Sequence, residues 1–251
     1  MDRYIGILDS GVGGISVLRE AVKLLPNENF IYYGDNKNAP YGPKPIEEIV
    51  QLSKNAVDYL LSRNVKALVL ACNTITSAYA KQLRSEVTIP VIGMEPAVKP
   101  ASLARCGGKI LALATKATLS LDKFSVLMEN YGEGVIPLEG KGLVEIVESG
   151  KRCSPEAHNA LEEIFKPYLN EQIDGIVLGC THYPFLRRQI EQFFPDAMIF
   201  DGLEGTVRQL KRRLAEENRL NSVNKTGDVR FETSGSEDTI ELMKKLFTEV
   251  I

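Results

Sequence analysis

Short apolar runs alternate along the chain with longer segments whose apolar residues recur every three or four positions. The short runs predict strands at residues 4–8, 30–33, 67–71, 91–92, 109–114, 134–137, 175–178, 197–200 and 229–232. The longer segments predict helices at residues 15–25, 46–63, 76–84, 119–130, 143–148, 155–168, 185–194 and 204–218. This alternation is typical of α/β proteins, in which helices cover parallel sheets.

One strand pattern occurs twice. Residues 65–74 read VKALVLACNT and residues 173–182 read IDGIVLGCTH, so each buried strand runs into a small residue, a cysteine and polar groups. The distance along the chain from Cys72 to Cys180 is close to the length of one small α/β lobe. We therefore predict two pseudo-symmetric lobes, each with a parallel sheet and a cysteine at a strand end, although two apolar strands could also be alike by chance.

Composition limits the class of protein. The chain has 251 residues, of which 44% are hydrophobic and 25% charged, so it can build a core without disulfides or a structural metal. A net charge of −3 gives no electrostatic footprint for nucleic acid, which we do not expect as a partner. No stretch approaches the roughly 18 apolar residues of a membrane span, and the first residues lack a secretory signal. A cytoplasmic protein without membrane partners is expected.

The cysteines indicate where chemistry occurs. There are four, Cys72, Cys106, Cys153 and Cys180, and no two are close enough in sequence for a zinc or redox motif. With only two histidines in the chain, no metal site is expected. Cys106 and Cys153 fit the ordinary role of small hydrophobic residues. Cys72 and Cys180 instead lie where a strand gives way to a helix, and a helix N-terminus favours a thiolate.

Polar residues accompany both of these cysteines. Asn73 and Thr74 follow the first, and Thr181 and His182 follow the second. These side chains suit a polar ligand, and His182 could exchange a proton with Cys180 or with a substrate. A third segment places Tyr41-Gly42 on a turn flanked by prolines, which predicts a rigid lip whose backbone amides meet a substrate carboxylate.

The first strand leads into a glycine-rich turn, in the sequence IGILDSGVGGISVL. Backbone amides at such a helix start attract anions, while Asp9 and Ser10 place a carboxylate and a hydroxyl at the strand end. A dinucleotide fingerprint requires a third glycine where Ser16 stands. A dinucleotide site, with Asp35 as the acid that binds ribose, nevertheless remains an alternative.

The ordered motifs ILDSGVGG, PYG, ACNT, ATKAT, LVEIVESG and GCTHYP resemble those of bacterial glutamate racemases over residues 5–201. Aspartate racemases of the same superfamily open with a GGMGP-like turn and carry Glu after the second Cys-Thr. DSGVGG and His182 resemble the glutamate-specific branch instead. The resemblance implies a cofactor-independent enzyme that interconverts L- and D-glutamate and supplies D-glutamate for peptidoglycan.

The resemblance also implies an architecture. Two α/β lobes would enclose the active site in the cleft between them, and the C-terminal segment would return to complete the first lobe. Residues 1–96 and 208–251 would then form the first lobe, and residues 97–207 the second. Family members are commonly homodimers.

Roles for single residues follow from the same resemblance. Cys180 would take the proton from L-glutamate and Cys72 the proton from D-glutamate, with Asp9 assisting Cys72. His182 would assist Cys180, and Glu148 would be a further acid near it. The implied substrate-binding residues are Asp9, Ser10, Tyr41, Gly42, Asn73, Thr74, Thr118, Thr181 and His182.

The chain departs from the family pattern at three places. Asn36 replaces a threonine, Gly140 lies where a cysteine is often found, and the continuation after Asp201-Gly202 is unusual. Three alternatives to a glutamate racemase remain. They are an aspartate or other cofactor-independent amino-acid racemase, a cysteine hydrolase with Cys180 as nucleophile and His182 as base, and a non-catalytic or dinucleotide-binding protein.

Overall fold

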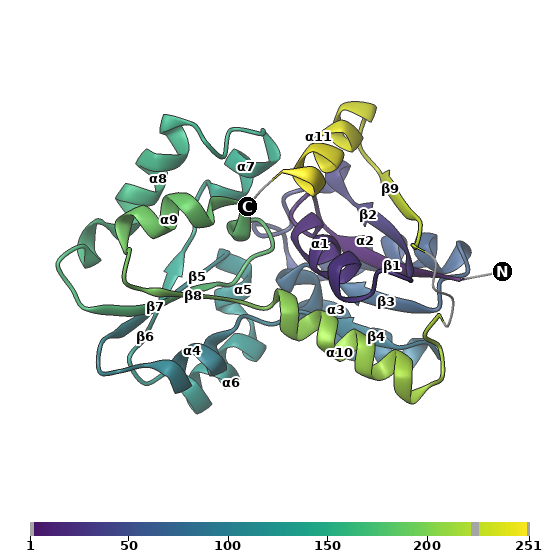
Figure 1. The fold of residues 1–251 in the computed structure, drawn as a ribbon, viewed down its shortest axis with the longest axis horizontal. Helices are drawn as coiled ribbons and strands as arrows, with labels where there is room; N and C mark the ends of the chain where they lie inside the picture. Colours follow the sequence, from purple (N-terminus) through teal and green to yellow (C-terminus); the bar gives the residue numbers. More distant parts are fainter. Residues whose placement is uncertain (1–2, 222–225, 250–251) are drawn as a thin grey trace. The chain divides into compact units, whose positions relative to one another are not determined.

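The computed structural model describes residues 3–221 and 226–249 and divides the chain into two compact units (Figure 1). Unit 1 contains the described residues up to Met94 and from Leu203 onward, and unit 2 contains Glu95–Gly202. The predicted first lobe includes residues 1–2, 222–225 and 250–251, which lie outside the described residues.

Unit 1 is built on a five-stranded parallel sheet with the order β4-β3-β1-β2-β9. Its strands are β1 (Tyr4–Asp9), β2 (Asn29–Gly34), β3 (Ala67–Leu70), β4 (Val91–Gly93) and β9 (Val229–Thr233). The three central strands are almost wholly buried, as their continuous apolar runs predict. The C-terminal strand β9 pairs with β2 and forms one edge.

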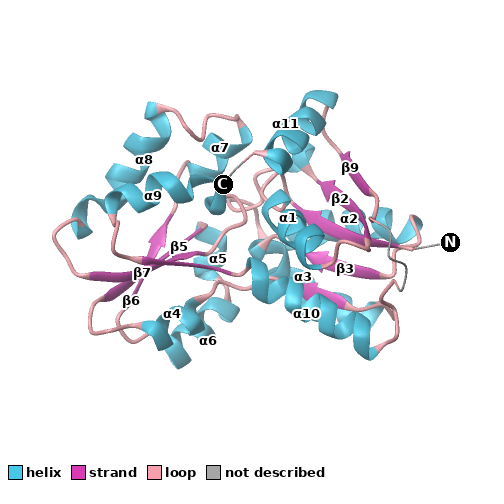
Figure 2. Cartoon of the chain, in the orientation of Figure 1, coloured by secondary structure: helices cyan, strands magenta, loops and turns pink. Residues whose placement is uncertain are grey.

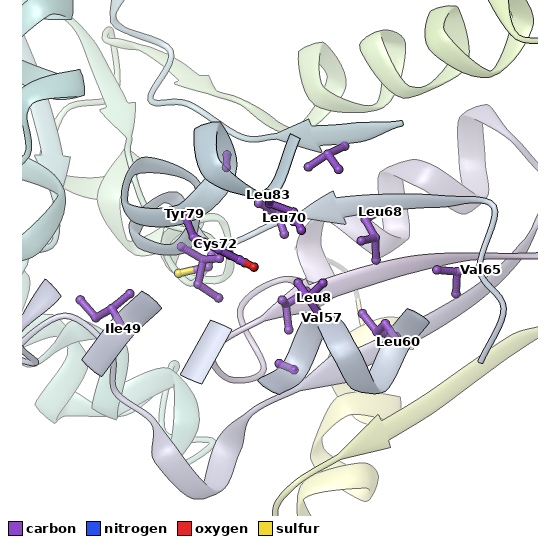
Figure 3. Packing of buried hydrophobic residues seen from close by; sticks show 14 of the residues in the cluster. Leu8, Ile49, Val57, Leu60, Val65, Leu68, Leu70, Cys72, Tyr79 and Leu83 are labelled. Carbon is purple, nitrogen blue, oxygen red and sulfur yellow. The ribbon is translucent and has the colours of Figure 1, made fainter. Parts of the chain in front are cut away.

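Helices cover the sheet of unit 1 (Figures 1 and 2). They are α1 (Ile15–Leu24), α2 (Ile46–Ser62), α3 (Asn73–Glu86), α10 (Leu203–Glu216) and α11 (Glu237–Thr248), with a short 3-10 turn η1 (Asn36–Asn38). Helix α1 contacts α10 and α11, whereas α2 contacts α3. Apolar residues of α2 and α3 pack with Leu8, Leu68 and Leu70 of the sheet in one core cluster, which also contains Cys72 (Figure 3).

Unit 2 repeats this plan with a four-stranded parallel sheet, β6-β5-β7-β8. Its strands are β5 (Lys109–Ala114), β6 (Val135–Glu139), β7 (Ile173–Leu178) and β8 (Met198–Asp201). Its helical segments are α4 (Val98–Ala104), α5 (Lys116–Ser120), α6 (Asp122–Tyr131), α7 (Leu143–Glu148), α8 (Pro155–Phe165), η2 (Lys166–Tyr168), η3 (Tyr183–Leu186) and α9 (Arg187–Phe193).

The two sheets have the same strand order. Reading β4-β3-β1-β2 in unit 1 and β8-β7-β5-β6 in unit 2, the strands correspond one to one, and β9 is an addition to unit 1. Strands β3 and β7, which precede the two similar cysteine motifs, therefore occupy equivalent positions. This confirms the predicted fold class of two pseudo-symmetric parallel-sheet α/β lobes.

All nine predicted strands are present, but the helices differ from the prediction in several places. The predicted helix at 119–130 is two helices, α5 and α6, because Leu121 between them has an extended backbone. Helices α4 and α11 were not predicted. Among the described residues, no helix is both long and apolar enough to cross a membrane.

Candidate active site

Sequence-predicted residues gather at the carboxyl edge of the unit 1 sheet. Strand β1 ends at Asp9 and Ser10 follows it, while Cys72 comes two residues after the end of the neighbouring strand β3. Strands β2 and β3 lie on opposite sides of β1, so the strand order reverses between β1 and β3. Ligands of parallel α/β sheets bind at such a reversal.

Cys72 is buried, with 8% of its surface exposed, and it directly precedes α3. The Cys72 Sγ lies 3.5 Å from the Ser10 Oγ, which is within hydrogen-bonding distance for sulfur. The first backbone amides of a helix lack intrahelical acceptors and carry partial positive charge. The start of α3 therefore favours a negative charge at this position. We call Asp9, Ser10, Tyr41, Gly42, Cys72, Asn73 and Thr74 the Cys72 half-site.

Asp9 is completely buried, and its Oδ1 accepts a 2.9 Å hydrogen bond from the Gly11 backbone amide. A close approach of α1 holds this carboxylate in place. A Cβ atom at Gly14 would lie 2.7 Å from the Asp9 Cβ and 2.9 Å from the Ala71 Cβ, distances that real Cβ atoms do not show. Glycine at 14 thus lets the start of α1 pack against the ends of β1 and β3.

Two further groups of this half-site are buried polar side chains. Asn73 and Thr74, at the start of α3, are both nearly inaccessible. Within the described residues, neither amide atom of Asn73 has a hydrogen-bond partner. Because a buried amide without partners is costly, Asn73 is a group that a polar ligand would satisfy.

Tyr41 is buried, and its hydroxyl donates a 2.6 Å hydrogen bond to Asp35 Oδ2. Burial, the hydrogen bond to Asp35 and the charge of Asp35 raise the pKa of Tyr41 far above 10, so the phenol keeps its proton. Asp35 also accepts bonds from Asn38 and Ser234. Its carboxylate is thus already occupied by protein donors, which argues against the ribose-binding role of the dinucleotide alternative.

Unit 2 presents its own polar group at the equivalent sheet edge. Cys180 follows β7 by two residues and is buried, as are Thr181 and His182. The Gly179 backbone amide donates to the Leu113 carbonyl of β5, so the segment that carries Cys180 is held against the neighbouring strand. We call Thr118, Glu148, Cys180, Thr181 and His182 the Cys180 half-site.

A continuous chain of contacts runs through the Cys180 half-site. Cys180 Sγ lies 3.6 Å from His182 Nδ1, and His182 Nε2 lies 2.6 Å from Glu148 Oε1. Glu148 ends α7, so this helix supplies the carboxylate. Burial lowers the pKa of His182, but hydrogen bonds to Cys180 and Glu148 and their negative charges raise it, and the net shift is upward. Glu148 and Cys180 thus both favour the protonated form of the His182 imidazole.

The two threonines of this half-site have different partners. Thr181 Oγ1 lies 3.4 Å from His182 Nδ1, which places it beside the thiol–imidazole contact. Thr118 follows β5 in α5, and its backbone amide donates to Thr115 Oγ1, the helix N-cap. Its hydroxyl also lies 3.0 Å from Thr115 Oγ1, so Thr118 takes part in capping α5.

We expect Glu148→Gln to lower the pKa of His182, because it removes the negative charge beside Nε2 while keeping an oxygen acceptor. Protonation of His182 stabilises the folded wild type below the ordinary pKa of 6.5, and this stabilisation is lost as pH rises through the raised folded-state pKa. The variant should lose it at lower pH. Imidazole C2–H NMR titration measures the shift, and His158→Gln in both backgrounds leaves His182 as the single signal. An unchanged titration would contradict this role of Glu148.

The departures from the family pattern lie beside the two half-sites. Asn36 Oδ1 accepts a hydrogen bond from Thr233 of β9. Gly140 faces Tyr183, whose hydroxyl donates to the Gly140 carbonyl at 3.3 Å and would collide with a Cβ atom at position 140. Asp201 ends β8 at the carboxyl edge of the unit 2 sheet, directly before Gly202.

Two residues beside the Cys72 half-site have no role among those that the sequence predicts for a racemase. For Asp35 the sequence predicts only ribose binding, although its position after β2 at the carboxyl edge is a signal for a role in this site. Ser234, its partner, follows an edge strand and lies in no recognised motif.

In the part of the chain that the structure describes, no three His, Cys, Asp or Glu side chains are grouped as metal ligands would be.

The chain is similar to proteins of known family. The Asp/Glu/Hydantoin racemase family model matches residues 5–210. A curated glutamate racemase of Clostridium botulinum (strain Okra / Type B1) is 49% identical over 250 residues, which cover 98% of this chain and 97% of the relative.

Two solved structures have a closely similar fold. A glutamate racemase isoform from Bacillus anthracis is 33% identical with a TM-score of 0.86, covering 97% of this chain and 92% of that one. An Escherichia coli glutamate racemase, solved in complex with L-glutamate, is 29% identical with a TM-score of 0.85, covering 97% and 95%.

Proposed function

The chain belongs to the Asp/Glu/Hydantoin racemase family, and we propose that it interconverts L-glutamate and D-glutamate. One observation carries the proposal from the molecule itself. Two buried cysteines stand at equivalent strand ends of two sheets with the same strand order, and each has its own polar partners. The names of the relatives favour glutamate over aspartate as the substrate.

Inversion at Cα requires removal of a proton from one face and delivery of another to the opposite face. A single fixed base would return the proton to the face it came from. Two acid/base groups, one for each face of the same substrate, solve this problem, and the two cysteines fill these roles in the proposal. Each must be a thiolate when it accepts a proton and a thiol when it donates one, so the resting pair shares one proton.

On the Cys180 side, the thiolate takes the α-proton of L-glutamate and becomes a thiol. A protonated His182, held by Glu148, stabilises the thiolate before the step. This arrangement keeps the charge of the base close to a fixed positive group.

On the Cys72 side, the thiol delivers its proton to the opposite face and becomes a thiolate. Ser10 and the start of α3 stabilise that negative charge, and Asp9 lies beside them. The carbanion that forms between the two steps needs hydrogen-bond donors on the α-carboxylate. The Asn73 amide, which has no hydrogen-bond partner among the described residues, is suited to this role. The backbone amides of the Tyr41–Gly42 turn are suited to binding a substrate carboxylate equally throughout the reaction.

The proposal also covers the need for a cofactor, the compartment, the oligomeric state and the use of the product. The enzyme, an isomerase acting on amino acids, would work without a cofactor, because two thiols supply both proton transfers. It would act in the cytoplasm as a homodimer and supply D-glutamate for peptidoglycan synthesis. The isomerase activity is supported by the named relatives, and the rest by the resemblance of the motifs.

We expect purified protein to convert L-glutamate into D-glutamate, measured by chiral chromatography. In deuterated water, the D-glutamate product should carry solvent deuterium at Cα, because the donating thiol exchanges its proton before the substrate binds. The remaining L-glutamate should gain label more slowly. D-Glutamate that keeps its original α-hydrogen in the first turnovers would refute the two-thiol mechanism.

A matched experiment tests independence from cofactors. Protein treated with a chelator and with hydroxylamine, which traps pyridoxal, should racemise at the untreated rate. Activity that is lost on treatment and restored by a metal or by pyridoxal phosphate would contradict this part of the proposal.

The contacts of Cys180 also favour a second candidate function. A thiol, an imidazole and a carboxylate in series form the arrangement of a cysteine hydrolase. Such an enzyme would need Cys180 but not Cys72, so the cysteine variants discussed below separate the two functions.

A further inference from the structure

We propose that the C-terminal turn at residues 233–235 positions the Cys72 half-site for substrate binding. Through Asp35 this turn holds the Tyr41 side chain, and through Tyr41 it holds the backbone amides of the Tyr41–Gly42 turn. The inference rests on the proposed function, because it assigns those amides to the substrate carboxylate.

Asp35 is the centre of the connection. It directly follows β2, and its backbone amide donates a 3.0 Å hydrogen bond to the carbonyl of Asp9. Its carboxylate is buried and accepts bonds from the Tyr41 hydroxyl at 2.6 Å and from the Ser234 hydroxyl at 2.6 Å. The Asn38 amide donates to both carboxylate oxygens at 3.0 Å. One side chain thus links the Cys72 half-site with the end of β9.

The 233–235 turn is itself fixed to the strand end beside Asp9. Within the sheet, Asp9 pairs with Gly34, and Gly34 pairs with Thr233. The single hydroxyl proton of Thr233 is shared between the carbonyl of Gly34 and Asn36 Oδ1, each of which lies 3.0 Å from Thr233 Oγ1. The Ser234 amide donates to the Gly34 carbonyl, and Ser234 Oγ accepts a bond from the Lys37 amide. The Ser234 hydroxyl therefore has a defined direction toward Asp35.

The charge of Asp35 makes each donor important. The donors that the described residues supply to its carboxylate are neutral hydroxyl and amide groups, so none of these bonds brings a positive charge to it. A buried carboxylate that loses one donor has to move toward another or admit water. Loss of the Ser234 hydroxyl is therefore transmitted to the bond with Tyr41.

Tyr41 connects this network to the substrate side. Its ring belongs to the same core cluster as Cys72, Ile49 and Tyr79 (the last three labelled in Figure 3). The hydroxyl is fixed as a donor to Asp35, and the ring is fixed by the core. The backbone of the Tyr41–Gly42 turn has little freedom while both contacts persist, and it gains freedom when the hydroxyl is released.

The test compares steady-state kinetics of Ser234→Ala and Tyr41→Phe with the wild type. Each should raise KM for L-glutamate and for D-glutamate about tenfold, the usual size for one hydrogen bond to a charged group. The value of kcat should stay within about twofold, because the amides bind the substrate and the transition state alike. Ser234→Thr, which keeps the hydroxyl, should restore KM.

The double variant shows whether Ser234 acts through Tyr41. If it does, Ser234→Ala should add little to KM in the Tyr41→Phe background. Two controls remove hydroxyl bonds of the same length elsewhere in unit 1. Tyr79→Phe loses a part-buried 2.6 Å bond to Glu86, and Ser53→Ala loses a buried 2.6 Å bond to the Ile49 carbonyl. Both should leave KM unchanged.

Three outcomes would overturn the inference. An unchanged KM in Ser234→Ala, an equal rise in the two controls, or independent effects in the double variant would each do so while the wild type still racemises glutamate. A wild-type protein that does not racemise glutamate overturns the proposed function and this inference together.

Discussion

Cys72→Ala and Cys180→Ala should each reduce racemisation in both directions by about 10³-fold or more, since the lost group supplies an entire proton transfer. Each cysteine is the base in one direction and the acid in the other, so neither direction survives the loss of either thiol. Initial rates from L-glutamate and from D-glutamate, measured separately by chiral chromatography, check this.

The variants should still differ in a half-reaction. In Cys72→Ala the remaining Cys180 can remove the α-proton of L-glutamate and return solvent deuterium to the same face. L-Glutamate should therefore exchange its α-hydrogen without inversion, and D-glutamate should do so in Cys180→Ala. NMR of the α-proton in deuterated water follows both reactions.

The exposed cysteines provide matched controls. Cys106→Ala and Cys153→Ala make the same substitution at exposed cysteines and should keep wild-type activity. Near-normal racemisation by Cys72→Ala would contradict the two-base mechanism. Hydrolysis that depends on Cys180 and not on Cys72 would support the cysteine hydrolase instead.

Lys66→Met should lower the free energy of unfolding by about 3–5 kcal/mol, the usual cost of leaving a buried charge without its partner. The side chains of Lys66 and Glu28 are 5% and 2% exposed, and Lys66 Nζ lies 2.5 Å from Glu28 Oε2. Lys66 Nζ also donates to the Arg219 carbonyl at 2.7 Å and to Asn221 Oδ1 at 2.8 Å. The substitution leaves Glu28 buried with an uncompensated charge.

Denaturant unfolding measures this loss as a shift of the midpoint, provided that the wild type and the variant have the same m-value, the slope of the free energy of unfolding against denaturant concentration. The double variant Lys66→Met/Glu28→Met should recover much of the stability, because it removes both charges together. Lys44→Met breaks the partly exposed pair with Glu48 and should change stability by less than about 1 kcal/mol. A Lys66→Met protein as stable as the Lys44→Met protein would show that the buried pair contributes little.

Local sequence predicted the strands well because their apolar character is continuous. Parallel strands that are covered on both faces need apolar side chains throughout, so the strand can be recognised from its own residues alone. Cys72 and Cys180 were equally predictable, because they stand where such a strand ends, whereas Cys106 and Cys153, expected as small hydrophobic residues, are exposed. Helix α11 was not predicted, although Glu237 and Asp238 in its first turn and apolar residues at 240, 243 and 246 carry a helical pattern.

Features that depend on tertiary pairing could not be read from local sequence. Helix α4 is short and has Pro100 in its first turn, so its pattern is too brief to distinguish from a loop. The connection between Asp35 and Ser234 spans 199 residues. It exists only because β9 pairs with β2, and nothing in the neighbourhood of either residue specifies that pairing.

The late position of β9 has a consequence for synthesis of the protein on the ribosome. Strand β2 emerges early, but its outer neighbour is made only after all of unit 2. During translation β2 is an open edge, with backbone groups available to other chains. Unit 2, which is continuous in sequence, can fold while the sheet of unit 1 still waits for its last strand.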